Sequence, residues 1–176
     1  MPWRSPAGQP AWARPALLAV AVVAAVGYGW GMAGASVESF YGAAARSMSE
    51  SWHDFIFGAF DPAGTVTVDK LPGALWVQAL SLRVFGFHIW ALVLPQVVEG
   101  VLTVRVLYRA VRRLAGPAAG LTAAAVLAVT PVTVLLSRGN VSDSLLVLLL
   151  VLAADATSAA LLTGSLRQLL LAAIPG

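Results

Sequence analysis

The chain has 176 residues, of which 59% are hydrophobic and 11% charged, with a net charge of +3 and no cysteine. Roughly a quarter of the residues of a soluble domain are charged, so this composition, with a mean hydropathy of +0.83, indicates an integral membrane protein. The basic residues flank apolar runs and do not mass on one polar face, which excludes a typical nucleic-acid partner. The lack of cysteine excludes disulfides and thiolate metal sites.

The first apolar run covers residues 15–35 and follows a tail, residues 1–14, that holds Arg4 and Arg14. A signal peptide is the alternative interpretation, because the tail is basic and small residues lie near the end of the run. However, the run exceeds the roughly 7–15 apolar residues of a cleavable signal and matches a span of about 30 Å. We therefore expect an uncleaved transmembrane helix.

A polar loop over residues 36–88 follows. It holds five of the eight acidic residues of the chain and Lys70, the single lysine. Residues 73–87 within it are apolar but interrupted by Gln78, Ser81 and Arg83, which favours a short interfacial helix over a span. The loop is also rich in aromatic residues. Most of them are expected to bury the loop against the bundle or the bilayer edge, and one or two, such as Tyr41, to stack on a sugar ring.

Three further spans are predicted, at residues 89–110, 118–136 and 144–162. Gly116 and Pro117 mark a tight turn, residues 137–143 form a short polar turn, and residues 168–176 begin another apolar helix. The predicted fold is all-α, a polytopic transmembrane helix bundle with about four spans and the start of a fifth. The membrane domain would cover residues 15–176.

The basic residues predict the orientation of these spans, because lysine and arginine concentrate on the cytoplasmic side. With the N-terminus in the cytoplasm of a multi-pass plasma-membrane protein, loop 36–88 and turn 137–143 fall together on the external face. The inner ends then carry Arg4, Arg14, Arg109, Arg112, Arg113 and Arg167, and the outer side carries Arg46, Lys70, Arg83 and Arg138. The shared external face of the two polar segments is the strongest physical indication of a site.

Two candidates in the loop have both a structural and a chemical interpretation. Glu38 suits either a solvated carboxylate at a helix start or a general base held near a partly apolar pocket. Asp69 and Lys70 suit either a surface ion pair or, since an ammonium at the membrane surface attracts phosphate, a contact to a lipid phosphate.

Other charged and polar residues are weighed in the same way. Arg138, Asn140 and Asp143 lie in a turn that is short for so much polarity, where capping of the next helix, snorkelling or a site role all remain open. Glu99 and Asp155 fall within spans and are expected to meet a neighbouring helix or the interface. His53 and His88 have no further ligands at a metal-binding spacing, so no metal or other cofactor is expected.

Four stretches together resemble bacterial glycosyltransferase family 39 proteins, which are similar to protein O-mannosyltransferases and the lipid A aminoarabinose transferase. They are ESFYGAAARSM (residues 38–48), SWHDFIFGAFDPAGTVTVDKLPGALWVQALSLRVFGF (51–87), LPQVVEGVLTVRVLYRAVRRLAGP (94–117) and RGNVSDSLLVLLLVLAADA (138–156). The resemblance implies a membrane transferase that moves a sugar from a polyprenyl-phosphate donor to a protein, lipid or glycan hydroxyl at the external face.

Carried over by position, the resemblance makes Glu38 the expected general base. Asp69 and Lys70 match an acid-Lys-Pro-Pro element, which places Asp69 with the catalytic residues and Lys70 at the lipid phosphate. Arg138, Asn140 and Asp143 match the second external turn, where further substrate contacts are expected. One departure is that Leu71 and Pro72 stand where the family has two prolines.

A second departure is length, because members of the family have many more spans. The chain is therefore expected to be the N-terminal part of such an enzyme. The alternative is a non-catalytic membrane subunit, or a truncated remnant that acts as a helix-bundle scaffold, since four spans need not enclose a groove for the donor lipid. A transporter is disfavoured, because no inverted repeat is visible.

Overall fold

The structure is a computed structural model that describes residue 5 and residues 8–164. Within these residues the regular elements are helices, accompanied by one isolated β-bridge between Ala59 and Thr67. Three helical segments of the described chain are long and apolar enough to cross a membrane: Ala13–Gly34, Ile89–Val129 and Asp143–Thr163. The predicted all-helical membrane architecture is therefore confirmed. The predicted start of a fifth span lies outside the described residues. The same holds for Arg4 and Arg167, which were used to predict the orientation.

The first apolar run forms α1 (Ala13–Gly29), followed by the 3-10 helix η1 (Met32–Gly34). Gly31 separates them with a left-handed backbone at φ 68°. The α-helix therefore begins two residues before the predicted start of the span and ends earlier, since the last predicted residues form the 3-10 turn and the extended segment after it.

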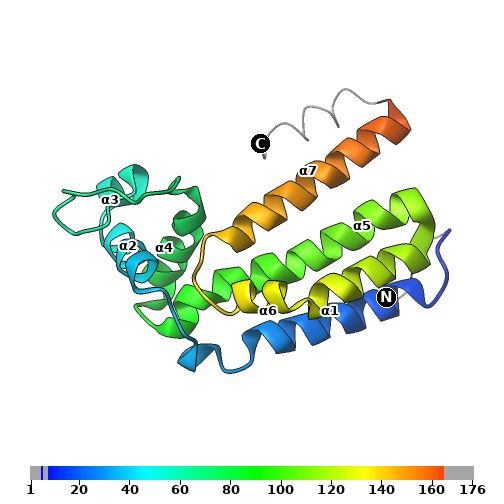
Figure 1. The fold of residues 1–176 in the computed structure, drawn as a ribbon, viewed down its shortest axis with the longest axis horizontal. Coiled ribbons are helices and arrows are strands. Elements are labelled where there is room, and N and C mark those ends of the chain that lie inside the picture. The colour runs from blue at the N-terminus through cyan, green and yellow to red at the C-terminus, as the bar shows by residue number, and fades with distance from the viewer. Residues whose placement is uncertain (1–4, 6–7, 165–176) are drawn as a thin grey trace. The chain divides into compact units, whose positions relative to one another are not determined.

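The predicted second and third spans join in one element, α5 (Ile89–Val129), which is interrupted at Gly116 by a non-helical backbone with φ 86° and ψ 171°. The ribbon of α5 reverses direction and returns alongside itself (Figure 1). Gly120 permits this close return: a Cβ built there would lie 2.8 Å from the carbonyl oxygen of Tyr108 and 3.0 Å from the Cβ of Arg112. The predicted turn at Gly116 and Pro117 is therefore observed, within a helical hairpin.

The predicted third span differs from the structure at its end. Helix α5 stops at Val129, and a separate short helix, α6 (Pro131–Ser137), follows. Pro131 has no N–H to donate to the carbonyl four residues earlier, so the helical ladder is broken there. After a short turn the chain enters α7 (Asp143–Thr163), which covers the predicted fourth span.

The described chain divides into two compact units. One unit comprises the described residues up to Gly27, residues 100–134 and the residues from Val147 onward. Its buried hydrophobic residues are mostly alanine, including Ala24, Ala124, Ala128 and Ala160. Small side chains at contacts allow close packing of helix backbones, which is how helices associate in lipid.

The second unit comprises residues 28–99 and 135–146. Loop 36–88 forms three short helices here, α2 (Ser39–Glu50), α3 (Trp52–Phe57) and α4 (Gly73–Phe85), and α2 packs against both others (Figure 1). A buried cluster lies beneath α2, made of Ala44, Met48, Val68, Leu75 and Ala79, with Phe40, Tyr41, Phe55 and Phe60 packed against it. These four aromatic residues therefore stabilise the loop itself, whereas Trp52, Phe57, Trp76, Phe85 and Phe87 are exposed. The interfacial position of the loop helices stays a prediction.

Candidate active site

Glu38 starts helix α2. Its backbone is extended, with φ −72° and ψ 119°, and its Oε2 accepts hydrogen bonds from the N–H groups of Phe40, at 2.6 Å, and Tyr41, at 3.4 Å. These N–H groups have no partner within the helix, so the carboxylate is a normal N-cap that also complements the helix dipole. The structural interpretation of Glu38 is confirmed. Its other oxygen, Oε1, accepts no hydrogen bond from the described residues and remains available for chemistry.

Asn140 fixes the backbone of Glu38 from the other polar segment. Its Oδ1 accepts from the N–H of Glu38 at 2.6 Å, and its Nδ2 donates to the Glu38 carbonyl at 2.9 Å. The side chain of Asn140 is fully buried, and its own carbonyl accepts from Nε2 of Gln78, which is also buried, at 3.1 Å. Both functional atoms of the Asn140 amide are thus used in positioning the start of α2.

A cavity of about 700 Å³ lies in this unit and is called the Glu38 cavity below. Its walls come from two segments, residues 31–39 and residues 135–141, so it brings Glu38 and Arg138 to one space. Pockets that hold small ligands have volumes of roughly 300–1,000 Å³, so this cavity is large enough for a sugar unit. The guanidinium of Arg138 also approaches Gly31, since a Cβ at Gly31 would lie 4.0 Å from Nη2.

Lys70 forms a second cluster with residues of the same two polar segments. Its Nζ donates to Oγ of Ser142 at 3.5 Å, lies 3.9 Å from Oδ1 of Asp143, and stands 5.3 Å from the ring centre of Tyr41. The side chains of Lys70 and Asp143 are almost half exposed, so this ion pair adds little to stability and stays accessible to a ligand.

The ionisation of Lys70 follows from these neighbours. The Tyr41 side chain raises the pKa of the Lys70 ammonium above its ordinary value, and the carboxylates of Asp143 and Asp69 act in the same direction. Burial is slight and opposes the shift only in part. Lys70 is therefore a fixed positive charge at neutral pH, which suits binding of an anion and not proton transfer.

A small hairpin places Asp69 and Lys70. The N–H of Phe60 donates to the Val66 carbonyl at 2.8 Å, and the N–H of Val68 donates to the Gly58 carbonyl at 2.9 Å. Gly58 has φ 64°, and a Cβ there would lie 2.9 Å from the Cβ of Pro72, so both backbone strain and crowding favour glycine. Pro72 in turn precedes α4, which explains why the chain turns directly after Lys70.

Asp61 closes the loop of this hairpin. Its carboxylate accepts hydrogen bonds from the hydroxyl of Thr65 and from the N–H groups of Ala63, Thr65 and Val66. These bonds, with that of the Thr65 hydroxyl as the largest cause, lower the pKa of the Asp61 carboxyl. Asp61 therefore organises the loop that leads to Lys70.

The predicted site residues thus fall into two neighbouring groups in one unit. Glu38, Arg138 and Asn140 line the Glu38 cavity, and Tyr41, Asp69, Lys70 and Asp143 lie at or beside the Lys70 cluster. The two groups are linked by α2, where Tyr41 donates its N–H to Glu38, and by the turn that holds Asn140 and Asp143. Asp143 is also the first residue of α7, so its predicted place at a helix start is confirmed.

Two contributors were missed by sequence reasoning. Gln78 holds Asn140, and its one sequence signal is polarity inside an otherwise apolar stretch. Ser142 contacts Lys70, although in sequence it indicates only a helix cap. Among the residues predicted to be structural, Asp155 pairs with Arg109 at 2.5 Å and Arg113 at 3.0 Å, and Glu99 is buried.

Comparison with known proteins decides the family. Residues 69–175 match the family described as dolichyl-phosphate-mannose-protein mannosyltransferase. The chain belongs to this family. The predicted glycosyltransferase relationship is thereby confirmed, and the match includes Asp69, Lys70, Arg138, Asn140 and Asp143, whereas Glu38 and Tyr41 precede it.

Two curated relatives from Bacillus subtilis (strain 168) resemble this mannosyltransferase-family chain. It is 42% identical over 137 residues to "Putative mannosyltransferase YycA", which covers 78% of the chain and 20% of the relative. It is 39% identical over 137 residues to "Putative mannosyltransferase YkcB", with 78% and 19% covered. The chain thus spans about one-fifth of the length of these relatives. No solved structure matches it.

Proposed function

We propose that this family member transfers a sugar from a polyprenyl-phosphate donor to an acceptor hydroxyl at the external face of the plasma membrane. The observation that carries the proposal is the gathering of Glu38, Arg138 and Lys70 around the two polar segments of one unit, with a cavity of about 700 Å³ beside Glu38. Family membership supports a glycosyltransferase. The polyprenyl-phosphate donor is what the family resemblance implies, and the external face is inferred from the distribution of lysine and arginine. The residue roles are inferred from that resemblance together with the chemistry of these side chains.

The reaction we propose is a direct displacement at the anomeric carbon. The acceptor hydroxyl gives its proton to Glu38 as its oxygen attacks that carbon, and the bond from the carbon to the phosphate oxygen breaks. The electron pair leaves with the polyprenyl phosphate, whose charge is neutralised by Lys70 and Arg138. No redox step and no further co-reactant is needed for this balance.

The hydrogen bonds of Glu38 support its role as base. Oε2 is held by two backbone N–H groups, which fixes the carboxylate, while Oε1 accepts no hydrogen bond from the described part of the chain. A base must reach the proton it removes to within about 3 Å, so fixing the carboxylate at the cavity wall reduces the reorganisation needed. We give Asn140 the role of a positioning residue, because its amide is already bonded to the Glu38 backbone.

The environment of Lys70 supports a phosphate contact. Its charge is stabilised by Tyr41, Asp143 and Asp69, yet its side chain keeps 45% of its surface exposed. A phosphate would compete with Asp143, which lies 3.9 Å from Nζ and therefore holds the ammonium only loosely. Asp69 sets the local charge, and Tyr41 offers an aromatic face to the same ligand.

The donor class is tested by measuring which labelled sugar donor is consumed by membranes from cells that express the protein. Radiolabelled polyprenyl-phosphate mannose should be consumed, and labelled nucleotide sugar should not be consumed directly. Lys70→Ala should slow consumption by about 100-fold, because one charge-stabilising contact to the leaving group is lost. Lys70→Arg, which keeps the charge, should retain more activity. Direct use of the nucleotide sugar, or no effect of Lys70→Ala, would contradict the proposal.

A further inference from the structure

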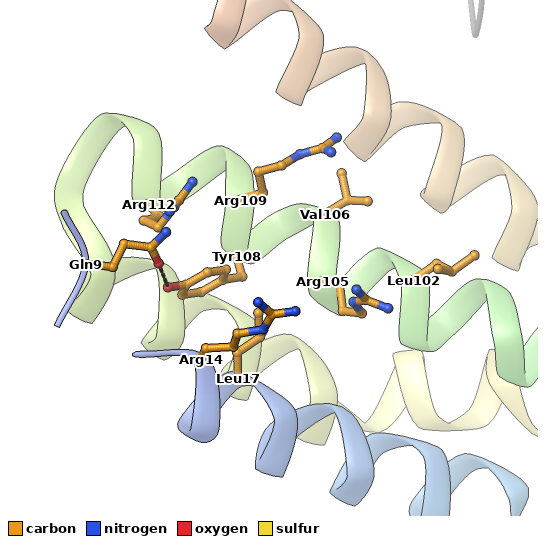
Figure 2. Close-up of a pocket in the computed structure, with 9 residues that line it drawn as sticks. All are labelled: Gln9, Arg14, Leu17, Leu102, Arg105, Val106, Tyr108, Arg109 and Arg112. Carbon is orange, nitrogen blue, oxygen red and sulfur yellow. Dashed lines mark hydrogen bonds between the residues drawn. The ribbon is translucent and has the colours of Figure 1, made fainter. Parts of the chain in front are cut away.

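A second cavity, of about 400 Å³, lies in the other unit and is lined by four arginines. They are Arg14 from α1 and Arg105, Arg109 and Arg112 from α5 (Figure 2). The three on α5 are spaced four and three residues apart, so they share one helix face. Of the nine described residues that line this arginine pocket, none is acidic.

Arg109 shares its carboxylate partner with an arginine outside the pocket. Asp155 contacts Arg109 through Oδ2 at 2.5 Å, but its other oxygen binds Arg113, so one carboxylate serves two guanidinium groups. Arg112 lies over the ring of Tyr108, with 5.7 Å to the ring centre, and its Nε is buried without a hydrogen-bond partner. An unsatisfied buried donor beside several guanidinium groups favours an anionic ligand.

The apolar part of the lining favours the phosphate of a lipid over a soluble phosphate. Leu102 and Val106 on α5 and Leu17 on α1 complete the wall of the pocket. Arg105 is the deepest arginine, three residues from Leu102. The other three lie toward the end of their span, Arg14 near the start of α1 and Arg109 and Arg112 near the break in α5, and Leu17 and Leu102 lie deeper. This order, charged at the end and apolar toward the middle, matches an amphiphile that stands upright in a bilayer.

We infer that the arginine pocket binds the phosphate headgroup of an anionic phospholipid, with the start of its acyl chains against Leu17, Leu102 and Val106. By the distribution of basic residues this end of the helices is expected at the cytoplasmic leaflet, where anionic headgroups attract arginine. The pocket involves none of the residues assigned to sugar transfer. It anchors α1 to the α5 hairpin through a shared lipid, which is a structural role separate from the reaction.

The experiment uses the purified chain in nanodiscs and measures retained lipid by native mass spectrometry. Phosphatidylglycerol should be retained in preference to phosphatidylcholine. Arg105→Gln with Arg112→Gln should reduce that preference by about 30-fold, since each arginine near the headgroups contributes to binding of anionic lipid. Arg46→Gln is the matched control, because it removes one arginine whose side chain is exposed and paired with Glu50 in the other unit.

Further measurements separate lipid binding from misfolding and from binding of a soluble phosphate. The single variant Arg105→Gln covers the case in which the double variant fails to fold. Because Arg105 is exposed, its replacement leaves no buried cavity, and it should still lower the retention of phosphatidylglycerol. Glycerol 1-phosphate and inorganic phosphate should compete only weakly, and the control Arg46→Gln should leave lipid retention unchanged. Equal retention of both phospholipids would overturn the inference, as would unchanged retention in the arginine variants. Soluble phosphates that bind as tightly as phosphatidylglycerol would overturn the assignment to a lipid.

Discussion

Asn140 makes two hydrogen bonds to the backbone of Glu38, a residue 102 positions earlier in the chain. The sequence shows only that its turn is more polar than a short turn requires. Which atoms Asn140 meets depends on how α2 packs in the second unit, and no local pattern encodes a partner so distant. The same limit applies to Gln78, which is polar in an apolar stretch and binds the Asn140 carbonyl.

Replacement of this buried amide should destabilise the second unit and slow transfer. Asn140→Ala leaves the N–H of Glu38 without its partner and removes one of the two hydrogen bonds to the Glu38 carbonyl, which keeps the bond from the N–H of Gly42. This loss costs about 2 kcal/mol of unfolding free energy. We expect a lower midpoint of thermal unfolding in detergent, and a lower kcat with little change in KM, because the base is misplaced while donor contacts remain. Ala43→Ser, an exposed change on α2 outside the Glu38 cavity, is the control and should leave both quantities near wild type.

The single lysine gives a direct measurement of the charge at the candidate phosphate contact. Biosynthetic 13C labelling of lysine yields one side-chain signal, that of Lys70. Its pKa should lie above the ordinary value of 10.5, and Tyr41→Phe should lower it, because the Tyr41 side chain is the largest cause of the increase.

The sign of the effect on stability follows from the direction of this shift. A raised pKa in the folded state means that the contribution of Lys70 is fully present below the unfolded pKa and is lost as pH rises through the folded value. The Lys70 contacts should therefore persist throughout the neutral range. A titration of Lys70 at or below 10.5 in the wild-type protein would count against the observed arrangement.

At the scale of the elements, apolar runs and turn residues predict most of the helices. Residues 15–35 cover α1 except its first two residues, residues 144–162 lie within α7, and the turn at Gly116 and Pro117 interrupts α5. The predicted span 118–136 is not continuous, because Pro131 begins a new helix after the ladder breaks. A proline near the end of an apolar run indicates this break, but hydropathy alone does not reveal it, since the flanking residues stay apolar.

The α5 hairpin depends on close approach at Gly120. Gly120→Ala should destabilise the first unit by about 1–3 kcal/mol, because the added methyl would meet the Tyr108 carbonyl at 2.8 Å and backbone must move. Gly27→Ala is the matched control: it meets nothing within 4 Å and should be neutral or stabilising, since alanine favours a helix. Thermal unfolding of both variants measures the difference, and equal stability would contradict the packing at this turn.

For the whole molecule, composition predicts a helical membrane protein, and the three long apolar helices agree. Composition does not predict that the described chain divides into two units, because this division depends on long-range contacts. The family is predictable from ordered motifs, and residues 69–175 carry the match that confirms it. The roles of the site residues stay predictions, as does the orientation of the helices.

The orientation is measurable because the natural chain has no cysteine. In intact cells, a membrane-impermeant maleimide should label Ala63→Cys in the exposed loop and should not label Ala115→Cys beside the α5 turn. Ala115→Cys should be protected because the basic cluster at the α5 turn favours the cytoplasm. After permeabilisation both cysteines should react. Labelling of Ala115→Cys in intact cells would reverse the predicted topology and move the candidate site to the cytoplasmic face.

The most direct measurement of the central claim is the rate of sugar transfer by Glu38→Gln, in membranes with protein amounts matched by immunoblotting. Glutamine keeps an oxygen that caps α2 but does not accept the proton of the acceptor hydroxyl. Transfer from polyprenyl-phosphate mannose should therefore fall by about 100-fold or more, while membrane insertion is unchanged. A variant that transfers at the wild-type rate would contradict Glu38 as the base and, with it, the site proposed around the two polar segments.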